Sequence, residues 1–232
     1  MSETVFLPII ALVIAILLHE VAHGLVALWM GDHTAKVAGR LTLNPLKHID
    51  RFGSIILPLI LLVGQLVTIK RVVFLYGWAK PVPVNPMNLR LGNYKNPRRL
   101  MAIVALAGPM MNFILALLGG VLIHPATLGP WPSVLNFLVY FIEINLILGI
   151  FNLIPMPPLD GGRIIVGILP LRLAVLVSQM EKIGLLVILL VLFILPLAFK
   201  QVGIMFDPFN EAFGVVVPWA VHVVLVLTGN HV

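Results

Sequence analysis

The chain contains no cysteine, which excludes disulfide bridges, thiolate metal sites and a cysteine nucleophile. Charged residues are also scarce: they make up 10% of the 232 residues, against about a quarter in a typical soluble domain. Hydrophobic residues make up 60%, and the mean hydropathy is +1.10. This composition excludes an ordinary soluble domain and predicts a polytopic membrane protein that lies in the lipid bilayer.

Acidic residues are the scarcer charged class, with 9 Asp and Glu against 15 Lys and Arg and a net charge of +6. In a soluble protein this balance would suggest nucleic acid. Here the basic residues flank apolar segments, so membrane topology and anionic lipid head groups explain them better, and we expect no nucleic-acid partner. Residues 1–4 contain no basic residue, so the first apolar segment is expected to be a retained span rather than a signal peptide.

Apolar segments recur along the whole chain, and about 20 residues are needed to cross the hydrocarbon core. The segments are 5–30, 52–69, 100–123, 134–154, 183–199 and 213–228. They predict an all-α polytopic membrane protein with about five to six membrane segments. We expect a single membrane-embedded domain over residues 1–232, with a core at 5–165 and C-terminal helices at 183–228.

The basic residues decide how the short segment 52–69 is interpreted. The loops before and after it, 31–51 and 70–99, are both rich in Lys and Arg, and a crossing segment would place them on opposite sides of the membrane. That arrangement violates the positive-inside rule. If 52–69 instead enters and returns, all Lys and Arg residues except Lys200 face the cytoplasm. The sequence therefore predicts a partly re-entrant insertion after the first helix.

Two parts of this insertion carry extended-chain signals. Apolar and polar residues alternate over residues 37–43, which predicts a short strand. The prolines of residues 81–86 favour extended backbone that could lie only at a sheet edge. We therefore expect a short β-containing insertion, and an edge near residues 37–43 could hold an unwound substrate by β-augmentation.

The motif His19-Glu20-Val21-Ala22-His23 lies inside the first apolar segment. On a helix the two imidazoles lie one turn apart on the same face, which is the spacing that grips one zinc ion. The glutamate between them is placed to act as a general base toward water. Ionisable residues inside a span are costly and are functional by default. The motif thus predicts a metal-dependent hydrolase within a membrane, with Glu20 as the catalytic residue.

A catalytic zinc site normally has a third protein ligand. Asp160 is the preferred candidate, because residues 152–162 end the fourth segment in a proline-broken, glycine-rich stretch. With 52–69 returning, His19, His23 and Asp160 fall at a similar depth on the cytoplasmic side. Asp160 could instead merely cap a helix, and Glu143, an acid inside a span, is the rival ligand.

Two asparagines complete the set of candidate site residues. Asn152 either hydrogen-bonds neighbouring helices or holds the substrate carbonyl and its oxyanion. Asn112 is a second candidate for contact with substrate or oxyanion, although packing or cavity lining explains it better.

Three elements of the chain, taken in order, resemble the site-2 proteases, the zinc intramembrane proteases of peptidase family M50. They are HEVAH in an apolar helix, AGPMMN at residues 107–112, and NLIPMPPLDGG at residues 152–162, and together they lie within residues 15–165. The resemblance implies one zinc ion bound by His19, His23 and Asp160, with Glu20 as the base. Many members also carry a PDZ or CBS domain, and this chain resembles a compact form without either.

The function implied is that of a zinc metalloendopeptidase that hydrolyses peptide bonds in transmembrane segments of single-pass or other membrane proteins. We expect a multi-pass protein of the cell membrane with its active site toward the cytoplasmic side. Two rivals remain open: a non-proteolytic metal-binding protein such as a transporter or pseudoprotease, and a membrane metalloprotease that uses Glu143 and cuts soluble loops. The oligomeric state is not predicted.

Overall fold

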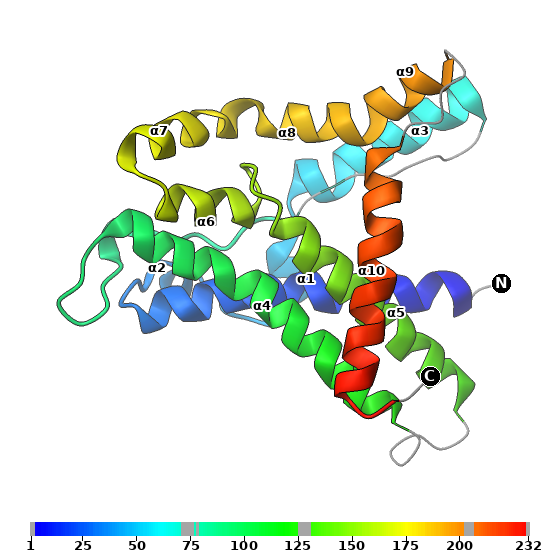
Figure 1. Ribbon diagram of the computed structural model, residues 1–232, viewed down its shortest axis with the longest axis horizontal. Helices are drawn as coiled ribbons and strands as arrows, with labels where there is room; N and C mark the ends of the chain where they lie inside the picture. Colours follow the sequence, from blue (N-terminus) through cyan, green and yellow to red (C-terminus); the bar gives the residue numbers. More distant parts are fainter. Residues whose placement is uncertain (1–2, 71–76, 78, 125–130, 202–206, 231–232) are drawn as a thin grey trace.

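The computed structural model describes residues 3–70, 77, 79–124, 131–201 and 207–230, and these form an all-helical chain (Figure 1). The helices in chain order are α1 Glu3–Trp29, α2 Thr34–Val37, α3 Leu57–Ile69, α4 Pro97–Ile123, α5 Pro132–Asn152, α6 Asp160–Ile168, α7 Leu171–Gln179, α8 Glu181–Leu189, α9 Leu195–Gln201 and α10 Pro208–Leu227. Short 3₁₀ turns lie at Pro45–His48 and Pro86–Asn88, and π-helical turns at Arg51–Ile56 and Leu190–Ile194.

Three helices in the described part of the chain are long and apolar enough to cross a membrane: Phe6–Trp29, Pro97–Ile123 and Pro132–Asn152. This is fewer than the five to six segments predicted. The predicted segment 183–199 is divided between α8, a π-helical turn and α9, while α3 has 13 residues. At 1.5 Å per residue α3 rises about 20 Å, less than the ~30 Å of a hydrocarbon core.

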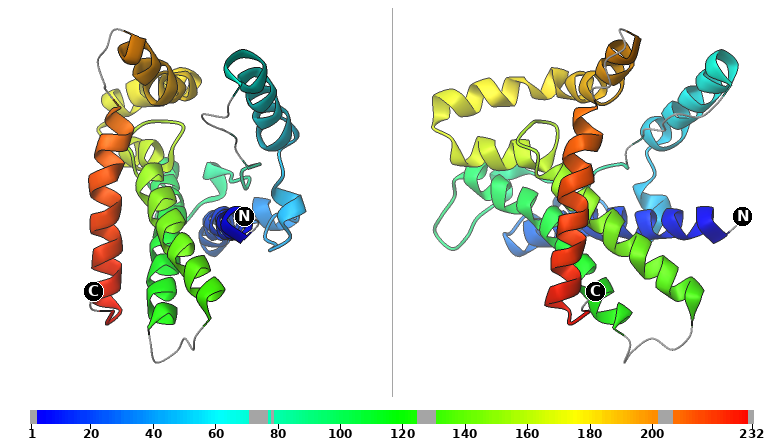
Figure 2. Two further views of the ribbon diagram at one scale, coloured as in Figure 1. Left: turned by 90° about the vertical axis from the view of Figure 1, so that its right-hand side faces the viewer. Right: turned by 45° about the vertical axis from the view of Figure 1, so that its right-hand side comes forward.

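The bundle core is built where α1, α4 and α5 cross, and α10 packs on α4 and α5 (Figures 1 and 2). Apolar side chains from the three spanning helices meet at Ala11, Leu115 and Phe141. Gly119 lies so close to α5 that an added Cβ would stand 2.8 Å from Ile142 Cγ1. Small residues at such crossings let helices approach closely, which is how membrane helices gain packing energy without a hydrophobic effect.

The chain after α5 folds back over one end of this bundle. Helix α6 packs along α4, and α7, α8 and α9 continue in a run beyond it (Figure 1). Helix α3 projects from the opposite side of this end, with α3 and the α8–α9 run standing apart in the turned views (Figure 2).

The predicted strand at 37–43 is wrong. Val37 ends α2, and the N–H groups of the next three residues bond back to the carbonyls of Thr34, Ala35 and Lys36. Gly39 then turns the chain at φ +63°. Backbone donors that are satisfied within one turn cannot pair with a neighbouring strand, so no strand forms in the described residues of the insertion.

The excursion that contains α3 begins and ends at one place. The N–H of Lys80 donates to the carbonyl of His48 at 2.8 Å, so the chain leaves the bundle at residue 48 and rejoins it at residue 80. The N–H of Arg90 bonds to the carbonyl of Met30, at the C-terminal end of α1. A segment that returns to its starting point fits the predicted re-entrant path, and entry into the membrane stays a prediction.

Residues 79–90, called the strap below, pass along the C-terminal half of α1. Residues 81–85 belong to no helix and join no sheet, and Asn85 has an extended backbone with φ −102° and ψ 106°. The helical Gly24 permits this contact, because a Cβ there would stand 2.9 Å from Val82 Cγ1. The strap thereby lies against the segment of α1 that carries the two histidines.

Candidate metal centre

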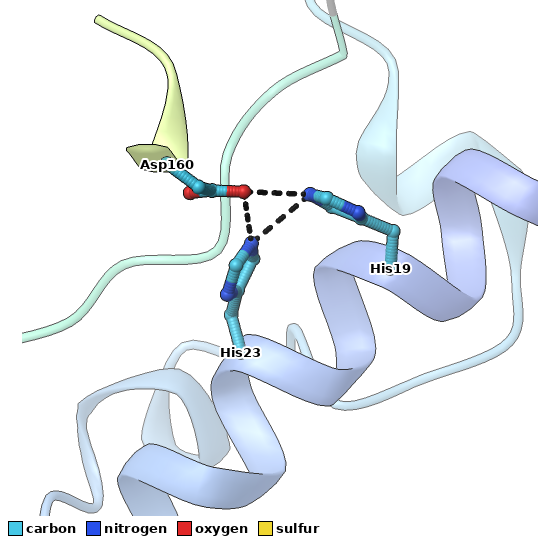
Figure 3. A group of neighbouring side chains, drawn as sticks. All are labelled: His19, His23 and Asp160. Atoms are coloured by element: carbon cyan, nitrogen blue, oxygen red, sulfur yellow. Dashed lines mark hydrogen bonds and ion pairs between the residues drawn. The ribbon is translucent and has the colours of Figure 1, made fainter. Parts of the chain in front are cut away.

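Three buried side chains from two elements meet at a single point (Figure 3). His19 and His23 stand one turn apart on α1, and Asp160 is the first residue of α6. The Nε2 atoms of the two histidines are 3.1 Å apart, and they lie 3.1 Å and 3.3 Å from Asp160 Oδ2. The side chains that the sequence places on the same side of the membrane are therefore in contact.

The hydrogen bonds on the far side of each ring fix what these atoms offer. His23 Nδ1 donates to the carbonyl of Val104 at 2.7 Å, and His19 Nδ1 donates to Asn112 Oδ1 at 2.6 Å. With the protons on Nδ1, both Nε2 atoms present lone pairs. Asp160 Oδ2 is buried without a hydrogen-bond partner. Three converging electron pairs repel one another unless a cation lies between them.

The spacing of the three atoms fits a metal ion. Ligand bonds of about 2.0–2.1 Å in a tetrahedron place ligand atoms about 3.3–3.4 Å apart, close to the observed 3.1–3.3 Å. The two neutral imidazoles and one carboxylate are also the donor types that zinc takes in catalytic sites. The group can thus hold a metal ion, and the residues fit zinc.

Helix α4 approaches this group closely at Gly108. A Cβ on Gly108 would lie 2.4 Å from His23 Nε2 and 2.6 Å from His19 Cε1, distances that no side chain tolerates. The close contact of α4 with α1 at Gly108 therefore lies at the imidazoles themselves.

Asn112 lies behind His19 rather than in an open space. It is fully buried, and besides accepting from His19 it donates through Nδ2 to Asn145 Oδ1 at 2.9 Å. Asn145 in turn donates to the carbonyl of Phe141. This chain fixes the amide orientation of Asn112 and hence the tautomer of His19, which suits Asn112 to positioning a ligand rather than contacting substrate.

A cavity of about 470 Å³ opens beside the three side chains, and both Glu20 and Asn152 line it. The nitrogen of the Asn152 side chain donates to the carbonyl of Leu148 at 3.0 Å, which leaves its oxygen toward other partners. The strap forms one wall of the cavity. The remaining lining residues are Ala79, Pro81, Val82, Val84, Met101, Val104, Ala105, Pro158, Leu159 and Arg163.

Glu20 is held by the strap, since its Oε2 accepts the backbone N–H of Val82 at 2.9 Å. Glu143, the rival ligand, lies on α5 and does not belong to the group of described residues that could hold a metal ion. Of the two acids weighed from the sequence, the structure brings Asp160 to the histidines.

Sequence reasoning missed two buried charged residues near the site. Asp32 accepts hydrogen bonds from Thr34, from the side chain of Asn88 and from the backbone of Asn85. Burial alone would raise the pKa of Asp32, but these hydrogen bonds outweigh it and lower the pKa below the ordinary carboxyl value. The Asp32-x-Thr34 pattern directly after a span was the available signal.

Arg40 is the second missed residue, and it is 7% exposed. Its guanidinium donates to the carbonyls of Lys47, Lys80 and Pro81. It therefore ties the strap to the turn at Pro45–His48. No pattern in the sequence distinguishes such an arginine from one that faces lipid head groups.

Comparisons with known proteins show which family the chain resembles. The family model of peptidase family M50 matches residues 7–129 and 126–195. The chain is 42% identical over 196 residues to "Putative zinc metalloprotease YwhC" of Bacillus subtilis (strain 168), an alignment that covers 82% of this chain and 80% of that protein.

A second relative is "Putative zinc metalloprotease Rip2" of Mycolicibacterium smegmatis, which is 31% identical over 162 residues. That alignment covers 68% of this chain and 55% of Rip2, so the chain spans about half the length of this relative. No solved structure matches the chain.

Proposed function

Because this chain belongs to peptidase family M50 and its relatives are named as putative zinc metalloproteases, we propose that it hydrolyses peptide bonds within the transmembrane segments of other membrane proteins. The observation that carries the proposal is the convergence of His19, His23 and Asp160 in a cavity that Glu20 also lines. The two histidines and Glu20 lie on α1, which is apolar enough to span the bilayer. A hydrolytic site at that depth suits a substrate bond that also lies in the membrane.

The residues of the site divide the work between them. His19, His23 and Asp160 would hold zinc, which when bound supplies a Lewis acid that lowers the pKa of water to about 7. Glu20 accepts the proton of the attacking water and passes it to the leaving amine. The Asn152 side chain, on the cavity wall, is placed to hydrogen-bond the scissile carbonyl as negative charge develops on its oxygen.

The predicted strand edge at 37–43 is absent, so it is not available to hold substrate in extended form. The strap is not a substitute edge of the usual kind, since Pro81 and Pro83 lack N–H groups. Among the described residues neither of these segments offers a strand edge, so we expect the unwinding of a substrate segment to depend on its own helix-breaking residues. We expect cleavage to favour substrate segments that contain Gly, Asn or Pro near the scissile bond.

Orientation is also part of the proposal. The basic loops 31–51 and 70–99 meet at the C-terminal end of α1, where Arg90 bonds Met30. By the positive-inside rule we expect that end, and with it the half of α1 that carries the two histidines, on the cytoplasmic side of the cell membrane.

The experiment that tests the function compares the wild-type chain with Glu20→Gln in detergent, using a single-pass membrane protein as substrate. Removing the base should lower cleavage by 100-fold or more while one zinc ion per chain is retained. A wild-type protein that binds zinc but leaves a panel of such substrates intact would favour the non-proteolytic alternative.

The ligand assignment is tested separately by measuring bound zinc in Asp160→Asn and Glu143→Gln. The first should lose zinc, because an amide replaces the anionic ligand. The second should keep it, because Glu143 lies outside the group that could hold an ion. The reverse pattern would support the metalloprotease that uses Glu143.

A further inference from the structure

The strap delivers a single backbone donor to the proposed catalytic base. Val82 is buried, and its N–H reaches Glu20 Oε2 at 2.9 Å across 62 residues of sequence. We propose that this N–H is a positioning group: it holds one carboxylate oxygen of Glu20 so that the other faces the water and the substrate amine. The inference rests on the proposed function of the same site and names a residue that its motif does not contain.

The sequence around Val82 suits this task. Pro81 and Pro83 have no N–H, so Val82 supplies the single backbone donor between residues 81 and 83. Pro83 also restricts Val82 to extended backbone, which removes most alternative directions for that donor. A donor held by its neighbours loses little entropy when it binds the carboxylate.

Two buried charges hold the strap on either side of Val82. Before it, Arg40 donates to the carbonyls of Lys80, at 2.6 Å, and Pro81, at 3.4 Å. After it, Asp32 Oδ2 accepts the N–H of Asn85 at 2.7 Å. Hydrogen bonds to charged groups are stronger than neutral ones. This clamping gives Asp32, just after α1, and Arg40, just after α2, a structural role at the strap.

The close approach at Gly24 completes the arrangement. The strap can lie against α1 at this point because a Cβ at Gly24 would stand 2.9 Å from Val82 Cγ1 and 2.5 Å from Leu41 Cδ2. Gly24 directly follows His23, so the strap crosses α1 next to the metal ligands. This close packing matters for Glu20, because a general base must lie within hydrogen-bond reach of the proton that it takes.

The consequence for the reaction is that the two carboxylate oxygens of Glu20 have different roles. Oε2 accepts the Val82 N–H before and after proton transfer, so the proton from water resides on Oε1. The water oxygen forms a bond to the scissile carbonyl carbon, and the proton passes from Oε1 to the nitrogen of the leaving amine as the C–N bond breaks, so that Glu20 is again a carboxylate. Without the N–H, the carboxylate could rotate and share the proton between both oxygens, and the reactive orientation would be less populated.

The test replaces Val82 with proline, which keeps extended backbone and removes the N–H. Val82→Ala is the reference, because it shortens the side chain and keeps the donor. We expect kcat of V82P to be about 10- to 100-fold below that of V82A, part of the 10²–10⁴ typical of a general base. KM for the substrate and zinc content should stay within about twofold of V82A. In a Glu20→Gln background the two variants should not differ.

A kcat of V82P equal to that of V82A would overturn the inference, as would a difference expressed in KM alone or one that persists without Glu20. These outcomes leave the proposed function standing, whereas a wild-type protein without cleavage activity removes it. If V82P does not fold, Arg40→Ala loosens the strap from a distance and should lower kcat with zinc retained. Arg40→Lys, which keeps one cationic donor, should recover part of that loss, and no recovery would count against the clamp.

Discussion

At the scale of single residues, the site depends on Gly108, which has no Cβ. Gly108 brings α4 against both imidazoles, and Gly108→Ala would force a methyl group into van der Waals overlap with His19 and His23. We expect the variant to lose most of its zinc, measured as metal per chain after purification, because ligands displaced by about 1 Å no longer share one ion.

Gly119→Ala is the matched control for Gly108→Ala, since it lies on the same helix and also meets a close neighbour. Its Cβ would lie 2.8 Å from Ile142, in a helix contact away from the metal ligands. The control variant should have a free energy of unfolding lower by about 1–3 kcal/mol because of overpacking, and it should keep its full zinc content. Equal zinc loss in both variants would mean that Gly108 acts through general packing alone.

Asn112 carries a second prediction at this scale. Asn112→Leu keeps the branched shape of the side chain and removes the acceptor for His19 Nδ1, so the ring loses the partner that fixes its tautomer. We expect zinc affinity, measured by competition with a chelator, to fall about 10- to 100-fold. Asn145→Leu, one hydrogen bond further from His19, should have the smaller effect. A larger loss in the Asn145 variant would contradict this order.

The residues that could be predicted from the sequence are those whose chemistry follows from their own spacing and from the topology. His19, Glu20 and His23 share one helix by periodicity, and the topology predicted from the basic loops put Asp160 at their depth, with Glu143 left as the rival ligand. Arg40 could not be found in this way, because its partners are backbone carbonyls, and for Asp32 only the nearby Thr34 gave a signal. Main-chain N–H and C=O groups are present at every residue, so the sequence does not mark which ones a charge will meet.

At the scale of elements, the strand predicted at 37–43 shows why alternation alone misleads in a short loop. Four residues of helix and the positive φ of Gly39 satisfy the local backbone donors first. Of the segment predicted as extended at 81–86, residues 81–85 lie outside any helix and join no sheet, and Pro86 begins a 3₁₀ turn, because proline fixes φ but selects no partner strand. The buried charges Asp32 and Arg40 bind the segment, and the bonds of Val82 to Glu20 and of Arg90 to Met30 join the strap directly to α1 and its end.

The strap leads to a pH prediction at this scale. Hydrogen bonds lower the pKa of Asp32 in the folded protein, so the unfolded chain binds the proton more readily. The stabilisation is complete above the ordinary carboxyl pKa of about 4, and it is lost as the pH falls through the lower pKa of the folded state. Asp32→Asn should therefore be less stable than wild type by about 2 kcal/mol near neutral pH.

The difference between wild type and Asp32→Asn should shrink as the pH falls below about 4, which thermal unfolding in detergent at a series of pH values would measure. Asp50→Asn is a suitable control, because Asp50 caps the turn at Arg51–Ile56 and asparagine caps about as well. A gap that stays constant with pH for Asp32→Asn would mean that its charge does not stabilise the strap.

At the scale of the whole molecule, the arrangement of the spanning helices and the returning excursion have to agree. Helices α1, α4 and α5 are long enough to cross the membrane, and the end of α5 brings Asp160 to the C-terminal half of α1. Three membrane crossings bring Asp160 to the histidines only if the segment 49–79 begins and ends on the same side of the membrane. The bond between Lys80 and His48 is what that path requires.

The absence of cysteine makes this topology directly measurable, because a single introduced cysteine reports its own side of the membrane. Lys36→Cys and Lys95→Cys lie on exposed residues of the two basic loops, and Trp131→Cys lies just before α5. A membrane-impermeant maleimide applied to intact cells should label position 131 and should reach positions 36 and 95 only after permeabilisation. Labelling of 36 and 95 from opposite sides would mean that the segment containing α3 crosses the membrane. The charge rule would then fail for this chain, and the cytoplasmic placement of the site would fail with it.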